Sequence, residues 1–232
     1  MRKKISLMPE RKHFEGFAPG ALDFFRRLRR NNRRDWFLKQ KTAYESTLVA
    51  PMKLLLEDIA ERLAYAKIPL APNRKSPVLR IYRDIRFSND KSPYKTLISA
   101  SLYRDGSKTN EGVLYISFSD KECFAASGFW QPERPVLHAW RERIAAKPKE
   151  FQAIHGAILK AGHDFVWTET LKRLPRGFDT HYDAPFAKYL KLTSFIVVRP
   201  ITSGEATSPS LPAEIAKFAI QTKALMEFGW SM

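Results

Sequence analysis

The chain has 232 residues, of which 44% are hydrophobic and 12% aromatic, so it is long enough and apolar enough to fold around a substantial core. Its single cysteine, Cys123, excludes an internal disulfide and a cysteine-based zinc site. With 40 Lys and Arg residues against 24 Asp and Glu, the formal net charge is +16, which predicts attraction to polyanions such as nucleic acid, acidic lipid surfaces or phosphorylated small molecules.

The N-terminal third of the chain is predicted to be helical. Residues 1–18 are expected to form a flexible basic arm. Apolar residues then recur at helical spacing between Pro19 and Asn31, which predicts a first helix. Further amphipathic helices are predicted from Asp35 onward, with Pro51 in the first turn of the last one.

The middle of the chain changes from helical spacing to alternation with a period of two. Residues 67–77 are predicted to be a connector, after which short runs separated by turn residues predict an antiparallel meander. The predicted strands are residues 78–83, 97–103, 112–118, 123–129 and 193–199, with a shorter one at 165–167.

The remaining elements are predicted to be helices. They are expected at residues 136–144, 148–162 and 185–190, and from 210 to 225 after a flexible loop at 203–210. Because helices lie at both ends and strands lie together, the sequence predicts an α+β fold: a central antiparallel sheet of about five to six strands with N-terminal, middle and C-terminal helices packed on it. Residues 19–232 are expected to form one domain.

No apolar run approaches the ~18 residues that a membrane-spanning helix needs. The single cysteine is typical of a reducing compartment. We therefore expect a soluble, cytoplasmic protein that is not associated with a membrane. The five histidines show no metal-ligand spacing, and the sequence contains no phosphate-cradling glycine loop or dinucleotide fingerprint, so we expect no metal and no cofactor.

Residues 80–96, with the sequence RIYRDIRFSNDKSPYKT, hold the densest group of polar side chains. If the segment begins as a strand, alternation places Asp84 and Arg86 on one face and Ile85 and Phe87 on the other. The following residues up to Pro93 are expected to form a turn, because Asn and Asp bond readily to their own backbone.

The segment carries five cations and two carboxylates, an excess of positive charge that predicts an anion-binding site. The expected ligand is a small molecule with phosphate or carboxylate groups. The predicted binding residues are Arg80, Arg83, Arg86, Lys91, Tyr94 and Lys95.

Two other interpretations of the segment remain open. Asp84 or Asp90 would act with the same cations in a hydrolase or transferase, and His181 is a separate candidate for acid–base catalysis. In the architectural interpretation, Arg83 or Arg86 pairs with Asp84, and Lys91 or Lys95 pairs with Asp90, only to hold the loop on the sheet.

A second basic feature lies in the first predicted helix. Six arginines fall between Arg26 and Arg34, on the face opposite the apolar residues. A basic stripe on a helix is a criterion for nucleic-acid binding, which is therefore an alternative function. A solvated helix face with no partner explains the same pattern.

Three motifs carry a resemblance to a known family. They are Asn31-Asn32 with Asp35-Trp36-Phe37 and Tyr44, the run RDIRFSNDKSPYKT at 83–96, and the pair GFWQP at 128–132 and LPRGF at 174–178. Over residues 14–200 the chain resembles the bacterial family of conserved hypothetical proteins called domain of unknown function 2461. The resemblance implies a single soluble domain and supplies no catalytic residues. The chain has Phe178 where a Tyr is more usual.

Overall fold

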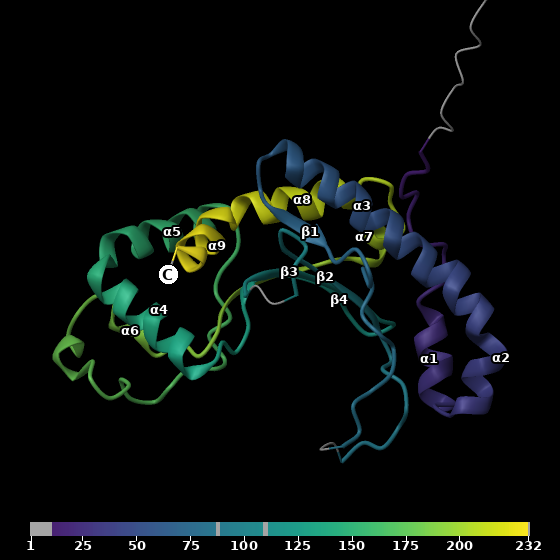
Figure 1. The fold of residues 1–232 in the computed structure, drawn as a ribbon, viewed down its shortest axis with the longest axis horizontal. Coiled ribbons are helices and arrows are strands. Elements are labelled where there is room, and N and C mark those ends of the chain that lie inside the picture. The colour runs from purple at the N-terminus through teal and green to yellow at the C-terminus, as the bar shows by residue number, and fades with distance from the viewer. Residues whose placement is uncertain (1–10, 87–88, 109–110, 232) are drawn as a thin grey trace, which may run out of the picture.

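The computed structural model describes residues 11–86, 89–108 and 111–231, and it confirms the predicted α+β class (Figure 1). The strands are β1 (Leu70–Pro72), β2 (Ile98–Arg104), β3 (Val113–Phe118), β4 (Cys123–Phe129) and β5 (Phe195–Pro200). The helices are α1 (Asp23–Arg30), α2 (Arg34–Tyr44), the π-helical turn η1 (Glu45–Val49), α3 (Ala50–Tyr65), α4 (Arg134–Ala146), α5 (Pro148–Lys160), the 3-10 turn η2 (Asp179–His181), α6 (Ala187–Leu190), α7 (Ser203–Ala206), α8 (Leu211–Gln221) and α9 (Lys223–Trp230). Within the described ranges, no helix has the length and apolar character needed to span a membrane.

The five strands form the predicted antiparallel meander, in the order β1-β2-β3-β4-β5. At its centre Ile116 pairs with Ala100 on β2 and with Ala125 on β4. Paired residues share a face of a sheet. These three side chains are fully buried, because α3 and α8 lie side by side over this face (Figure 1).

A long insertion between β4 and β5 forms a helical lobe at one end of the sheet (Figure 1). Trp140 of α4 is fully buried and stacks on Phe195 of β5, with ring centroids 4.1 Å apart. Phe228 of α9 contacts the same indole at 5.6 Å. Because these rings join the cluster that lies under α3 and α8, the lobe and the sheet share one hydrophobic core.

Part of the predicted flexible arm is packed on the domain. Residues 1–10 lie outside the described residues, but Phe14 and Phe17 are each only 2% exposed. The Phe17 ring lies 4.8 Å from that of Phe118 at the end of β3. The basic character of the arm predicted a solvated segment, whereas its two aromatic rings favour burial by the hydrophobic effect.

Asp58 of α3 holds this segment in place. Its carboxylate is 7% exposed and accepts hydrogen bonds from the backbone N–H of Phe14 at 2.8 Å and from the Arg11 guanidinium at 2.9 Å. His13 Nδ1 lies 2.9 Å from the same carboxylate. Burial raises the pKa of Asp58, but the hydrogen bonds from Phe14 and His13 and the nearby charges outweigh it, so the pKa is lowered overall.

The prediction of a strand at residues 78–83 is wrong. In the described residues, Val78 forms an isolated bridge with Ala100 of β2. Tyr82 forms another isolated bridge with Tyr94, and neither residue belongs to a strand. The first strand is instead β1, inside the predicted connector. Proline explains both results: Pro72 ends a short edge strand where its missing N–H is tolerated, and Pro77 removes a donor directly before Val78.

Segments around β5 also differ from the prediction. Residues 165–167 form one isolated bridge to β5 and no strand. The predicted flexible loop at 203–210 contains α7, which begins with a capping box in which Thr202 and Glu205 bond each other's backbone N–H. The predicted last helix is two helices, α8 and α9, which meet at Thr222. The Thr222 hydroxyl donates to Ser127 on β4 at 2.8 Å, and such buried side-chain bonds compete with helix continuity.

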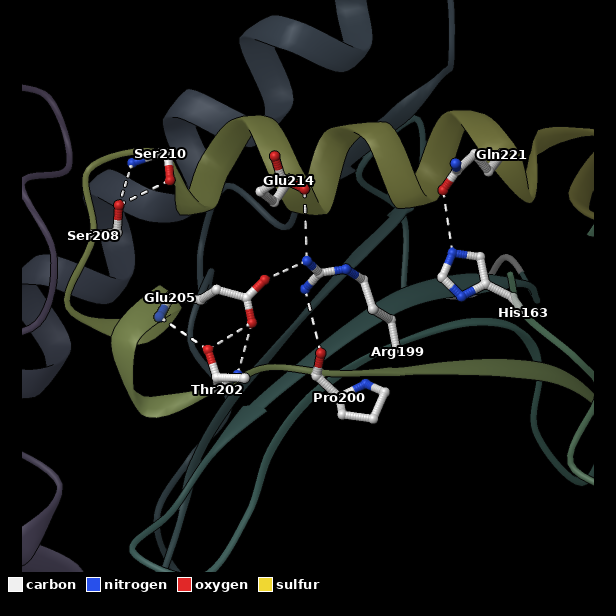
Figure 2. A network of polar contacts seen from close by, with 9 residues as sticks. All are labelled: His163, Arg199, Pro200, Thr202, Glu205, Ser208, Ser210, Glu214 and Gln221. Atoms are coloured by element: carbon white, nitrogen blue, oxygen red, sulfur yellow. Dashed lines mark hydrogen bonds and ion pairs between the residues drawn. The ribbon is translucent and has the colours of Figure 1, made fainter. Parts of the chain in front are cut away.

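Arg199 connects β5 to α7 and α8, as Figure 2 shows. Its guanidinium pairs with Glu205 of α7 and lies 3.6 Å from Glu214 of α8. The Ser210 hydroxyl bonds Ser208 and does not cap α8. The contacts of Arg199 therefore link the strand to the two helices that follow it.

Replacing Asp58 tests the packed part of the arm. We expect Asp58→Asn to lower the free energy of unfolding by about 3 kcal/mol, because it removes a buried charge from hydrogen-bonded partners. The lowered pKa also means that the carboxylate stabilises the fold above the unfolded aspartate pKa of about 3.9, and that this stability is lost as the pH falls through the folded value. Urea unfolding of both proteins between neutral and acidic pH measures the effect. An unchanged acid dependence in Asp58→Asn would contradict it.

Candidate functional site

The polar segment at residues 80–96, here called the signature hairpin, projects from the edge of β2 on the side of the sheet away from α3 and α8 (Figure 1). Its two limbs pair through two backbone hydrogen bonds, from Lys95 N–H to Ile81 at 2.8 Å and from Arg83 N–H to Pro93 at 2.9 Å. Between them Tyr82 and Tyr94 form an isolated antiparallel bridge. Pro93 has no N–H, so the ladder cannot extend further.

Tyr94 anchors the hairpin to the N-terminal helices. It is 1% exposed and stacks on Phe37 of α2, with ring centroids 4.2 Å apart. The Asn32 side chain donates to the carbonyl of Tyr94 at 2.8 Å and accepts from its N–H at 3.1 Å. The amide of Asn32 thus pairs with Tyr94 as a neighbouring strand would. Burial, and then the nearby Tyr82, raise the pKa of the Tyr94 phenol, although the charge of Arg34 acts in the opposite direction.

Asp84 forms a two-pronged ion pair with Arg86. The Arg86 Nε lies 3.0 Å from Asp84 Oδ1, and Nη2 lies 2.7 Å from Oδ2. The predicted strand alternation does not apply, because these residues form no strand, and the two side chains bind each other. The hydrogen bonds from Arg86 lower the pKa of Asp84. Ile85 is 40% exposed, and Phe87, the other half of the predicted apolar floor, lies outside the described residues.

Asp90 is bound within its own turn. It accepts a hydrogen bond from the backbone N–H of Ser92 at 2.9 Å and lies 3.2 Å from Arg83 Nη2. Hydrogen bonds from Ser92, and then the charge of Arg83, lower its pKa. Lys91 donates to the carbonyl of Ile85 at 3.0 Å, so it closes the turn from the other side.

These contacts divide the predicted binding residues into two groups. Arg83, Arg86 and Lys91 are bonded within the hairpin. In the part of the chain that the structure describes, Arg80 and Lys95 form no ion pair. Arg80 is exposed and Lys95 partly so. Two of the three net positive charges of the hairpin therefore reside on the second group, and the third is that of Lys91, which bonds a carbonyl.

The arginine cluster from Arg26 to Arg34, on α1 and at the start of α2, divides in the same way. Arg26 pairs with Asp23 at 3.0 Å, and Arg29 binds Asp120 through two contacts of 2.8 and 2.6 Å. Arg33 lies 3.5 Å from Asp35. The remaining arginines are exposed and form no ion pair with any described residue; they are Arg27, Arg30 and Arg34.

The structure does not bring His181 to the hairpin. It lies in η2, in the helical lobe at the opposite end of the molecule from α1 and α2 (Figure 1). Its ring packs near Phe186, with centroids 5.3 Å apart, and near Phe178. Among the described residues there is no group of three His, Cys, Asp or Glu side chains that could hold a metal ion.

Asn32 is the residue whose role the sequence did not indicate. Its position at the end of a helix predicts a cap, whereas its side chain pairs with a residue far along the chain. A second unpredicted group is buried in the lobe, where His155 bonds Tyr189 at 2.9 Å and Asp164 at 2.8 Å. Nothing in the sequence spacing signals either arrangement, because both depend on contacts between distant segments.

The fold and this surface define an α+β domain with a charged hairpin held against an arginine-rich helix pair. The family model described as "Conserved hypothetical protein (DUF2461)" matches residues 20–228, so the chain belongs to this family. No curated protein and no solved structure matches the chain.

Replacing Asn32 tests the anchor. We expect Asn32→Ala to lower the free energy of unfolding by about 2 kcal/mol, because it leaves two backbone groups of buried Tyr94 without partners. Hydrogen exchange should increase in residues 81–95. Asn31→Ala is the matched control, since among the described residues the Asn31 side chain bonds only the carbonyl of Arg27, and Asn31 is partly exposed. Equal effects of the two substitutions would contradict an anchoring role.

A second prediction concerns the ion pair at the surface. Asp84→Asn should destabilise the protein less than Asn32→Ala, because an exposed pair is screened by water and salt. Thermal unfolding at low and high salt measures this difference. If Asp84→Asn unfolds the protein, the pair is architectural and the anchor alone does not hold the hairpin.

Proposed function

We propose that the protein binds an anionic ligand, carrying phosphate or carboxylate groups, on the surface where the signature hairpin meets the start of α2. The observation that carries this proposal is the pair of hydrogen bonds between Asn32 and Tyr94. They bring the limb of the hairpin that carries Tyr94 and Lys95 to the start of α2, where Arg34 lies. The effect of the Arg34 charge on the Tyr94 phenol supports the same proximity.

The charge balance supports this choice. Arg34, Arg80 and Lys95 form no ion pair with a described carboxylate, although the charge of Arg80 helps to lower the pKa of Asp84. Arg80 and Lys95 lie on opposing limbs beside the hydrogen bond from the Lys95 N–H to Ile81, and cations near one another attract an oxyanion. Arginine binds phosphate or carboxylate through two parallel hydrogen bonds, and lysine adds a point charge.

The hydrolase or transferase alternative receives less support. A general acid needs a raised pKa near the working pH. Both Asp84 and Asp90 have lowered pKa values and accept hydrogen bonds from arginine or from the backbone. Binding without catalysis is therefore the function that the geometry favours, and a cytoplasmic location, which the single cysteine supports, would give access to phosphorylated small molecules.

The nucleic-acid backbone is a second candidate ligand. It is favoured by Arg27 and Arg30, which continue the exposed basic surface along α1. A single strand contacting these two arginines as well as Arg34, Arg80 and Lys95 predicts a slope of about −3.5 for log K against log salt concentration. A small phosphate ligand does not require the α1 arginines.

The double variant Arg80→Gln/Lys95→Gln tests the proposal. Calorimetric titration with pyrophosphate, and separately with a single-stranded oligonucleotide, measures the affinity. We expect the double variant to bind at least about tenfold more weakly, because it loses two charge-assisted contacts. Arg27→Gln/Arg30→Gln should weaken only the oligonucleotide.

The matched control is Lys149→Gln/Lys172→Gln, which removes the same charge from two exposed sites of the insertion between β4 and β5. It should bind as the wild type does. The proposal fails if the wild-type protein binds neither probe, or if the folded Arg80→Gln/Lys95→Gln protein keeps wild-type affinity.

A further inference from the structure

The face of the sheet opposite α3 and α8 contains an apolar cavity of about 560 Å³. Its floor comes from the outward positions of β3, β4 and β5, among them Tyr115, Phe124 and Val198. Trp130, just after β4, and Val166, in the insertion, contribute to its wall. A volume of this size is typical of sites for small organic ligands.

The floor of the cavity is hollow because its central residues are small. Ala126 lies in one row with Tyr115 and Val198. Gly128 lies in the next row, where a Cβ would come within 2.0 Å of the carbonyl oxygen of Phe195. Any larger residue at position 128 would therefore collide with the neighbouring strand.

Trp130 is held at the wall although its side chain is 55% exposed. The next residue, Gln131, has a φ of 41°, which is unfavourable for a residue with a side chain. Its N–H donates to the buried Ser194 hydroxyl at 2.9 Å, and its side-chain amide donates to Glu169 at 3.3 Å. A strained backbone that is fixed beside an exposed aromatic ring is a feature of ligand sites.

The lining determines which ligand fits. None of the lining residues, all of which lie in the described ranges, carries a charge. A charged group placed there would lose water without gaining a partner. Three aromatic side chains line the cavity, and the rings of Tyr115 and Phe124 are 5.8 Å apart. Aromatic rings favour edge-to-face or offset contacts with another ring.

From these observations we infer that the cavity binds the planar aromatic ring of a small molecule, which packs against Trp130, with any polar group of that molecule left at the mouth. This site is separate from the signature hairpin and does not depend on the anion-binding proposal. It gives a role to the GFWQP motif, in which Gly128 allows β5 to approach closely, Trp130 supplies the ring and Gln131 fixes its direction.

The test compares 2-naphthol with 1-decanol, a linear alcohol with the same number of carbon atoms, by calorimetric titration of the full chain. The wild-type protein should bind 2-naphthol at one site and more tightly than 1-decanol. Trp130→Ala should weaken 2-naphthol binding about tenfold through the loss of ring contacts. Ala126→Leu, which fills the floor, should weaken it at least as much.

Tyr65→Ala is the matched control, because Tyr65 is an aromatic side chain that is 93% exposed at the end of α3. It should leave binding unchanged. The inference is overturned if 2-naphthol does not bind, if 1-decanol binds as tightly, or if folded Trp130→Ala keeps wild-type affinity. Trp130 is exposed, so its replacement leaves the core intact and keeps the test valid even if Ala126→Leu fails to fold.

Discussion

The pairing of one asparagine side chain with the backbone of Tyr94 determines where the most polar part of this protein lies. An isolated hairpin is marginal in water, and the described residues of the signature hairpin form two backbone hydrogen bonds between its limbs. It is held because Asn32 satisfies both polar groups of a buried residue while the Tyr94 ring stacks on Phe37. The same contact places an arginine-rich helix pair beside the hairpin.

Charge in the hairpin is divided between structure and surface. Arg83 and Arg86 are bound to the two aspartates, which keeps those carboxylates ionised and fixes the turn. Lys91 closes the turn on the carbonyl of Ile85, and Arg80 and Lys95 are exposed or partly exposed. A simple count of basic residues therefore overstates the number that can bind a ligand. The structure separates the cations that are bonded within the hairpin from those that form no ion pair with a described residue. The uncharged cavity on the adjoining sheet face is a different kind of site, defined by small residues and aromatic rings.

Much of the fold follows from local patterns. Alternation over β2, β3, β4 and β5 predicted the meander, since a period of two admits only one buried face for each strand. The predictions that were wrong concern segments in which contacts with distant residues outweigh the local sequence pattern. Residues 78–83 alternate as a strand but lack a ladder, because proline precedes them and β1 already covers the other half of the β2 edge. Phe14 and Phe17 are buried, although the basic residues of their segment predicted that it would be exposed to solvent.

The sequence by itself determined the α+β class, the family and the residue types of a basic, anion-attracting surface, because periodicity and net charge are properties of the linear chain. It also pointed to Asp84 and Arg86 on one face. The tertiary structure alone decided that these two bind each other, that Asn32 joins two distant basic segments, and that His181 lies elsewhere. Side-chain pairings between distant segments depend on three-dimensional register, which no local pattern in the sequence encodes.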